Sequence, residues 1–177
     1  DDNCTESGAS SDNAPLGRIK CDPSEQMADY MVQRFVEAFG DVDVILAPGD
    51  AIAHHTAPHH DDPGTPDWEP VRKDLEASAS LLKKHFPDTK VLWSVGNNDG
   101  WHSQAPDESQ KESYFNYLYN LWITGYPGNA SFAASVKDTF MSAGYYRVDL
   151  SDTISVLLFE SEYMDNDDDT SFQGTEA

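Results

Sequence analysis

The chain has 177 residues, of which 38% are hydrophobic and 11% aromatic, which is enough for one folded domain with its own core. Its formal net charge is −21, from 32 acidic and 11 basic residues. A surface this acidic argues against nucleic acid or anionic membrane as a partner, because both require basic patches. An anionic substrate would need a local positive centre, which a bound metal ion usually supplies.

The N-terminal residues 1–21 are predicted to form a polar loop closed by a disulfide between Cys4 and Cys21. The sixteen residues between the cysteines are rich in Ser, Asp, Asn and Gly. Closing such a loop contributes ~3 kcal/mol, and two free thiols are the alternative. Asn3 and Asn129 each begin an N-glycosylation sequon, which together with the cysteine pair favours a secreted or lumenal protein. No apolar run approaches ~18 residues, so no transmembrane segment is expected.

The first regular elements are a helix and a strand. Asp22 or Ser24 can cap the N-terminus of the helix, apolar residues recur at helical spacing, and Gly40 ends it. The next apolar run, up to residue 47, contains Val, Ile and Leu without alternation. This pattern predicts a strand that is buried on both faces.

Two predicted strands are each followed by glycine and then by an oxygen-bearing side chain. The first strand ends at Pro48-Gly49-Asp50. An irregular loop over residues 51–67 and a helix over residues 68–86 follow, and the second strand, residues 90–95, precedes Gly96-Asn97-Asn98-Asp99. Repeated helix–strand order predicts parallel pairing, which brings Asp50 and Asn97 to one edge of the sheet. Turn residues that cap the next helix are the alternative for both positions.

The second half of the chain is predicted to contain two helices and a β-hairpin. A third helix begins at Pro106-Asp107-Glu108-Ser109, and its aromatic face is expected to be core. A short helix over residues 129–142 ends at Gly144. Residues 145–150 and 153–159 then form two antiparallel strands. Residues 160–177 form an acidic tail.

These elements predict an α/β fold and a single domain over residues 1–177, without an internal repeat or a linker. The chain stops soon after a strong strand and has no closing helix, so we expect it to be part of a larger domain.

The predicted edge of the sheet carries residues suited to metal chemistry. Asp50 and Asn97 are hard oxygen donors, and His54 and His102 lie four or five residues further along. A carboxylate that bridges two cations, with an amide oxygen on one of them, suits two divalent metals about 3.5–4 Å apart. Such a pair stabilises the attacking and leaving oxygens of a phosphoester and lowers the pKa of a bound water.

The ordered motifs of this chain resemble the calcineurin-like metallophosphoesterases. They are Gly49-Asp50, His54, Gly96-Asn97-Asn98-Asp99 and the hairpin at Gly144-Tyr145-Tyr146. Within that family the chain is most similar to acid sphingomyelinases and vacuolar endopolyphosphatases, whose Gly-Asp-x-x-x-His element matches Gly49 to His54. Their Cys-Asp-Ser-Pro element is similar to Cys21-Asp22-Pro23-Ser24 in rearranged form. The resemblance implies part of a metallophosphoesterase-type β-sandwich flanked by helices.

The resemblance also implies roles for individual residues. Asp50 corresponds to the metal-bridging carboxylate, Asn97 to a ligand of the second metal, and His54 to the histidine that assists the leaving group. Most members have a histidine where this chain has Asn98, and His102 is the alternative source of an imidazole. The implied cofactors are two divalent metal ions, with zinc expected and manganese or iron as alternatives.

The family's Asp-x-His, Gly-His and Gly-His-x-His motifs are absent from these 177 residues. We therefore expect the N-terminal portion of an incomplete domain, completed by the rest of the same domain or by another chain. The implied function is metal-dependent hydrolysis of a phosphodiester or phosphoester, outside the cell or in the lysosomal or vacuolar lumen. The alternative is an inactive glycoprotein of the same fold with a structural or binding role in an extracellular assembly.

Overall fold

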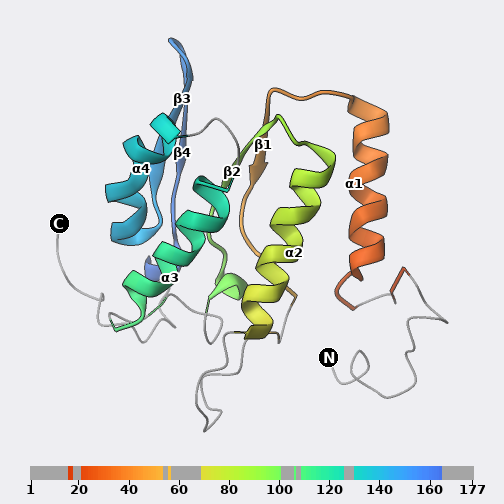
Figure 1. Cartoon of the computed structure of the whole chain (residues 1–177), viewed down its shortest axis with the longest axis horizontal. Helices are drawn as coiled ribbons and strands as arrows, with labels where there is room; N and C mark the ends of the chain where they lie inside the picture. Colours follow the sequence, from red (N-terminus) through yellow and green to blue (C-terminus); the bar gives the residue numbers. More distant parts are fainter. Residues whose placement is uncertain are drawn as a thin grey trace, which may run out of the picture.

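A computed structural model describes residues 16–17, 21–53, 56, 69–100, 106, 109–125 and 130–164. Helix α1 stands at one side of the molecule beside α2, and the hairpin of β3 and β4 stands at the other side, next to α3 and α4 (Figure 1). The elements in chain order are α1 (Glu25–Phe39), β1 (Val44–Ala47), α2 (Glu69–His85), β2 (Lys90–Trp93), the 3-10 helix Asn97–Asp99, α3 (Lys111–Leu118), the π-helix Tyr119–Ile123, α4 (Ala130–Ala143), β3 (Tyr146–Ser151), β4 (Ile154–Leu158) and the 3-10 helix Glu162–Met164.

Helix α1 begins and ends as the sequence predicts. Ser24 is the N-cap, and its hydroxyl accepts a hydrogen bond of 3.2 Å from the backbone N–H of Met27. At the other end, Gly40 has a φ of 67° and its N–H donates to the carbonyl of Val36. The left-handed backbone at Gly40 stops the helix and directs the chain into β1.

Strands β1 and β2 pair in parallel, with Val44 opposite Lys90 and Ala47 opposite Trp93. This confirms the predicted pairing across the helix α2. Because the strands are parallel and in register, their carboxyl ends leave the sheet at the same edge. The loops that follow β1 and β2 therefore start side by side.

The hairpin of β3 and β4 is also confirmed, since Tyr146 lies opposite Leu158 and Val148 opposite Val156 in an antiparallel ladder. The described residues thus contain one two-stranded parallel sheet and one two-stranded antiparallel sheet. Together with the helices, these sheets establish the α/β class.

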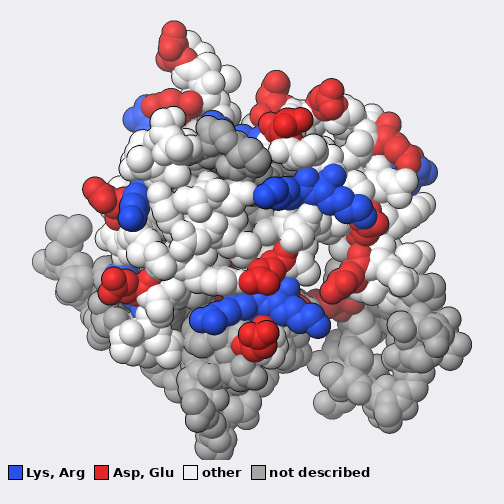
Figure 2. Space-filling view, viewed as in Figure 1, with Lys and Arg blue, Asp and Glu red and all other residues white. Residues whose placement is uncertain are grey.

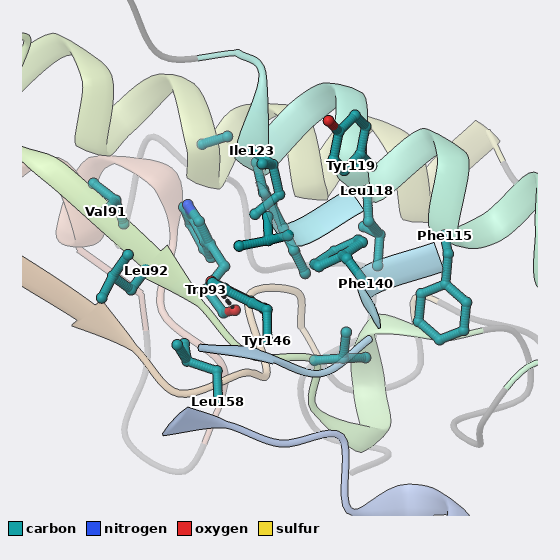
Figure 3. Packing of buried hydrophobic residues seen from close by; sticks show 14 of the residues in the cluster. Val91, Leu92, Trp93, Phe115, Leu118, Tyr119, Ile123, Phe140, Tyr146 and Leu158 are labelled. Carbon is teal, nitrogen blue, oxygen red and sulfur yellow. Dashed lines mark hydrogen bonds between the residues drawn. The ribbon is translucent and has the colours of Figure 1, made fainter. Parts of the chain in front are cut away.

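The core lies between β2, the helices α2 to α4 and the inner face of the hairpin (Figure 3). Trp93 of β2 stacks on Trp122 with ring centroids 5.0 Å apart and planes at 5°. The hydroxyl of Tyr146 donates a buried hydrogen bond of 2.7 Å to the carbonyl of Trp93, which ties the hairpin to β2 (Figure 3). Phe115 of α3 and Trp122 of the π-helix that follows it are fully buried, so the aromatic face predicted for the third helix is core.

The prediction that the first strand is buried on both faces is wrong. The side chain of Leu46 in β1 is 59% exposed, and no residue of α1 is buried. The reason is that α1 packs beside α2, where Asp29 contacts Lys84 and His85, and leaves an apolar groove against β1 open.

None of the described helices is both long and apolar enough to span a bilayer.

Candidate functional site

The candidate site is the edge of the parallel sheet where the loops after β1 and β2 meet. The N–H of Ser94 donates a 2.8 Å hydrogen bond to the carbonyl of Ala47, which continues the pairing one step past β2. Beyond this point the chain turns at Gly49-Asp50 in one loop and at Gly96-Asn97 in the other. The structure thus brings together two motifs that are 47 residues apart in the sequence.

The two loops touch through their glycines. A Cβ atom on Gly49 would lie 2.6 Å from the backbone nitrogen of Gly96, a separation that real side chains do not adopt. A Cβ atom on Gly96 would overlap the backbone nitrogen and the Oδ1 atom of Asp50. Gly49 in addition has a φ of 107°, which favours glycine. Glycine at both positions is therefore required for the close approach of the loops.

Asp50 has an unusual backbone conformation. Its φ is 53°, and it is the one non-glycine residue of the described part of the chain with a positive φ. Such a conformation costs about 1–2 kcal/mol for a residue with a side chain. The Oδ1 atom of Asp50 accepts a 3.0 Å hydrogen bond from the backbone N–H of Asn98. This bond stabilises the strained residue and places its exposed carboxylate against the second loop.

The second loop forms a single 3-10 turn over Asn97–Asp99. Asn97 is exposed at the edge of the sheet where the two loops meet, a region that we call the rim. Asn98, in contrast, is buried with 6% of its surface accessible. Because the N–H of Asn98 binds the Asp50 carboxylate, the residue adjacent to Asn97 is in direct contact with Asp50. Asp50 and Asn97 therefore belong to the same rim, as the parallel pairing predicts.

Asp99 joins the two loops, a contact that the sequence reading did not identify. Its side chain is fully buried, and its Oδ1 and Oδ2 atoms accept hydrogen bonds from the N–H groups of Ala51 and Gly96, at 2.7 and 2.9 Å. Burial raises the pKa of Asp99 to about 6; the Asp50 carboxylate adds to the rise, and the backbone hydrogen bonds oppose it. The acidic residue after Gly-Asn-Asn was the sequence feature that could have indicated this contact. The sequence does not distinguish a buried carboxylate from an exposed one, however.

A cleft of about 280 Å³ opens beside Asp50, between the N-terminal end of α1 and α2. Its lining contains carboxylates from three parts of the chain, namely Asp22, Glu25, Asp50 and Asp74. The hydroxyl of Ser78 in α2 donates to the carbonyl of Ala51 and so fixes the first loop against this helix. On the face drawn in Figure 2, two bands of basic side chains lie over α2, with acidic side chains next to them.

The other predicted site residues lie outside the described part of the chain: His54, His102, Cys4, Asn3 and Asn129. Cys21 is described, but Cys4 is not, so the disulfide between them stays a prediction. The roles of both histidines and both glycosylation sites likewise stay predictions.

The rim carries oxygen atoms of the kinds that bind divalent cations in proteins. Asp50 offers a carboxylate oxygen that is not used by Asn98, and the side chain of Asn97 carries an amide oxygen. The glycines keep this rim free of other side chains, because a Cβ on Gly96 would fill the space at Asp50. Within the described ranges no three His, Cys, Asp or Glu side chains cluster closely enough to hold a metal. The described rim therefore carries two candidate ligands, and a metal centre would need further ones.

The chain matches no protein-family model, and no curated protein is similar to it at a significant level.

Proposed function

We propose that the protein is a metal-dependent phosphoesterase whose active centre is the rim formed by Asp50 and Asn97. The observation that carries this proposal is the strained conformation of Asp50, held against the second loop by the N–H of Asn98. Backbone strain of this kind persists where the surrounding structure enforces it, and it concentrates at functional sites. In a turn that served only to reverse the chain, glycine would adopt this φ without steric cost.

The proposed roles follow from the donor types. Asp50 would hold the cations through its carboxylate, and Asn97 would bind one of them through its amide oxygen. When bound, the metal pair would supply a nucleophilic water and neutralise charge on the phosphoryl oxygens. His54 and His102 are the proposed sources of an imidazole that protonates the leaving oxygen, because Asn98 cannot donate a proton usefully at neutral pH.

The exposed apolar surface supports the finer fold proposal, a metallophosphoesterase-type β-sandwich to which further segments contribute. Leu46 and Phe39 are 59% and 67% exposed, although Leu46 lies in the apolar run of β1 and Phe39 belongs to the apolar stripe of α1. A parallel sheet is normally covered on both faces, so β1 requires more protein around it. We propose that the same domain or another chain supplies this cover together with the remaining metal ligands.

The proposal also includes a secreted or lumenal glycoprotein with a disulfide between Cys4 and Cys21 and glycans at Asn3 and Asn129. Zinc is the proposed metal, and manganese and iron are alternatives. The strongly acidic composition supports a metal as the centre that attracts an anionic phosphoester.

The test uses the complete protein as its gene encodes it. Hydrolysis of bis(p-nitrophenyl) phosphate and p-nitrophenyl phosphate is measured with and without a chelator, for the wild type and for Asp50→Ala. We expect the chelator to abolish hydrolysis and Asp50→Ala to reduce kcat at least about 100-fold. Asp152→Ala, in the exposed turn of the hairpin, is the matched control and should keep full activity. Full activity in Asp50→Ala would exclude the proposed role.

One observation favours a second candidate, an inactive protein of this fold with a binding or structural role. Asn98 occupies the position where the resembled family has its general acid, and it is buried. This candidate predicts that the complete protein neither hydrolyses phosphoesters nor binds zinc or manganese at the rim. Titration of the complete protein with each metal separates the two candidates.

A further inference from the structure

Asp99 connects the two loops that carry the proposed metal ligands. Its Oδ1 atom accepts a 2.7 Å hydrogen bond from the N–H of Ala51, and its Oδ2 atom accepts one of 2.9 Å from Gly96. Ala51 directly follows Asp50, and Gly96 directly precedes Asn97. One carboxylate therefore ties together the backbone segments next to both ligands.

Asp99 is not itself available as a ligand. Its side chain has no accessible surface, and each oxygen already accepts a backbone hydrogen bond. Any effect of Asp99 on a bound cation therefore acts through the two loops that it connects.

The backbone around Asp99 is fixed from other elements. The hydroxyl of Tyr114 in α3 donates a buried 3.2 Å hydrogen bond to the carbonyl of Asp99. The N–H of Asp99 donates to the carbonyl of Gly96, which closes the turn. On the opposite loop, the hydroxyl of Ser78 in α2 holds the carbonyl of Ala51. The side chain of Asp99 thus connects two loops, and each loop is also hydrogen-bonded to a helix.

The geometry points to Asp99 as the positioning residue of the metal centre, which sets the separation of Asp50 and Asn97 and thereby the affinity for divalent metal. This inference rests on the proposed function. Metal ligands must be held within about 0.5 Å of their productive positions. Groups that orient such ligands without touching the metal change metal affinity by about 10–100-fold when they are removed.

The experiment measures binding of Zn²⁺ and of Mn²⁺ to the complete protein by calorimetric titration. We expect Asp99→Asn, which keeps one acceptor oxygen, to weaken binding about 10-fold and Asp99→Ala, which keeps none, about 100-fold. At saturating metal, kcat for bis(p-nitrophenyl) phosphate should fall in the same order. KM should stay within about twofold, because Asp99 does not touch the substrate.

Two controls separate positioning from general damage. Val136→Ala removes buried volume from α4, a helix that carries no residue of the rim, and Asp88→Asn removes a carboxylate at the opposite end of β2. Both controls should bind metal within about twofold of the wild type. If Asp99→Ala does not fold, Asp99→Asn, which is nearly isosteric, carries the comparison.

The outcomes distinguish this inference from the proposed function. If the wild type binds metal, Asp50→Ala does not, and Asp99→Asn binds like the wild type, the positioning role is wrong and the proposed function stands. If Val136→Ala loses affinity as strongly as Asp99→Asn, general destabilisation explains the effect and the positioning role is also wrong. If the wild type binds no divalent metal, the proposed function is wrong and the positioning role falls with it.

Discussion

The Asp50 carboxylate accepts a 3.0 Å hydrogen bond from the backbone N–H of Asn98, which lies 48 residues further along the chain. This contact joins the loop after β1 to the loop after β2 and holds Asp50 at a φ of 53°. A residue kept in this conformation by a distant partner is expected to serve more than the turn itself.

The first prediction concerns the contact between the loops. In Gly96→Ala the new Cβ overlaps the backbone and side chain of Asp50, so we expect the free energy of unfolding to fall by about 1–3 kcal/mol. Urea denaturation measures this change. Metal binding should be lost as well, because the two loops must separate to admit the methyl group.

Gly40→Ala is the matched control for that variant. Gly40 has a φ of 67°, but nothing lies within 4 Å of the position of its Cβ. We expect a loss of about 1–2 kcal/mol from backbone strain alone and unchanged metal binding. Equal metal affinity in Gly96→Ala and the wild type would show that the tight approach of the loops has no bearing on the site.

The second prediction uses the strain at Asp50. Asp50→Gly and Asp50→Ala both remove the carboxylate, but only glycine adopts a φ of 53° without cost. Asp50→Gly should therefore be more stable than Asp50→Ala by about 1 kcal/mol in urea denaturation. Both variants should lack hydrolytic activity. Equal stability of the two variants would contradict the strained conformation assigned to Asp50.

The third prediction concerns the link between the hairpin and the parallel sheet. Tyr146→Phe removes the donor to the carbonyl of Trp93 and leaves a buried acceptor without this partner. We expect the free energy of unfolding to fall by about 1–3 kcal/mol. Tyr145→Phe is the control, since Tyr145 is 41% exposed, and it should change stability by less than about 0.5 kcal/mol. Equal effects of the two substitutions would show that this hydrogen bond contributes nothing.

The fourth prediction is a pH dependence of the attachment of α1. Hydrogen bonds from His85 and Lys84 hold the pKa of Asp29 below its ordinary value. A carboxyl whose pKa is lowered by folding stabilises the folded state above its unfolded pKa, and this contribution is lost as the pH falls through the folded value. The contact of α1 with α2 should therefore weaken below about pH 4.

Hydrogen exchange of the α1 amides, expressed as protection factors, measures this effect between about pH 6 and about pH 3. Protection should fall in the wild type at the lower pH. In Asp29→Asn it should be low at both values, because the ionic partner of His85 and Lys84 is absent throughout. Constant protection in the wild type would show that Asp29 does not hold α1.

Local patterns were sufficient to predict most of the elements and their pairing. Ser24 and Gly40 carry the signals for the ends of α1, and the apolar runs that became β1 and β2 are each followed by glycine and polar residues. Parallel pairing then follows from the helix between the strands. Because parallel strands end at the same edge of a sheet, this pairing was sufficient to predict that Asp50 lies next to the second loop.

The sequence did not indicate how much each element is covered. The same apolar spacing that is core in α3 is exposed in α1, because coverage depends on tertiary neighbours and not on period. The π-helix over Tyr119–Ile123 has no local signal either. Asp99 was missed because its two hydrogen-bond partners exist only once the two loops have met.

The proposed function depends on one divalent cation that Asp50 and Asn97 share. Anomalous diffraction from crystals of the complete protein grown with zinc, recorded on both sides of the zinc absorption edge, tests it most directly. We predict one anomalous peak about 2.0–2.2 Å from both a carboxylate oxygen of Asp50 and the amide oxygen of Asn97, and a second peak at the Asp50 carboxylate. A structure in which zinc binds elsewhere and the Asp50 carboxylate contacts only the N–H of Asn98 would contradict the claim.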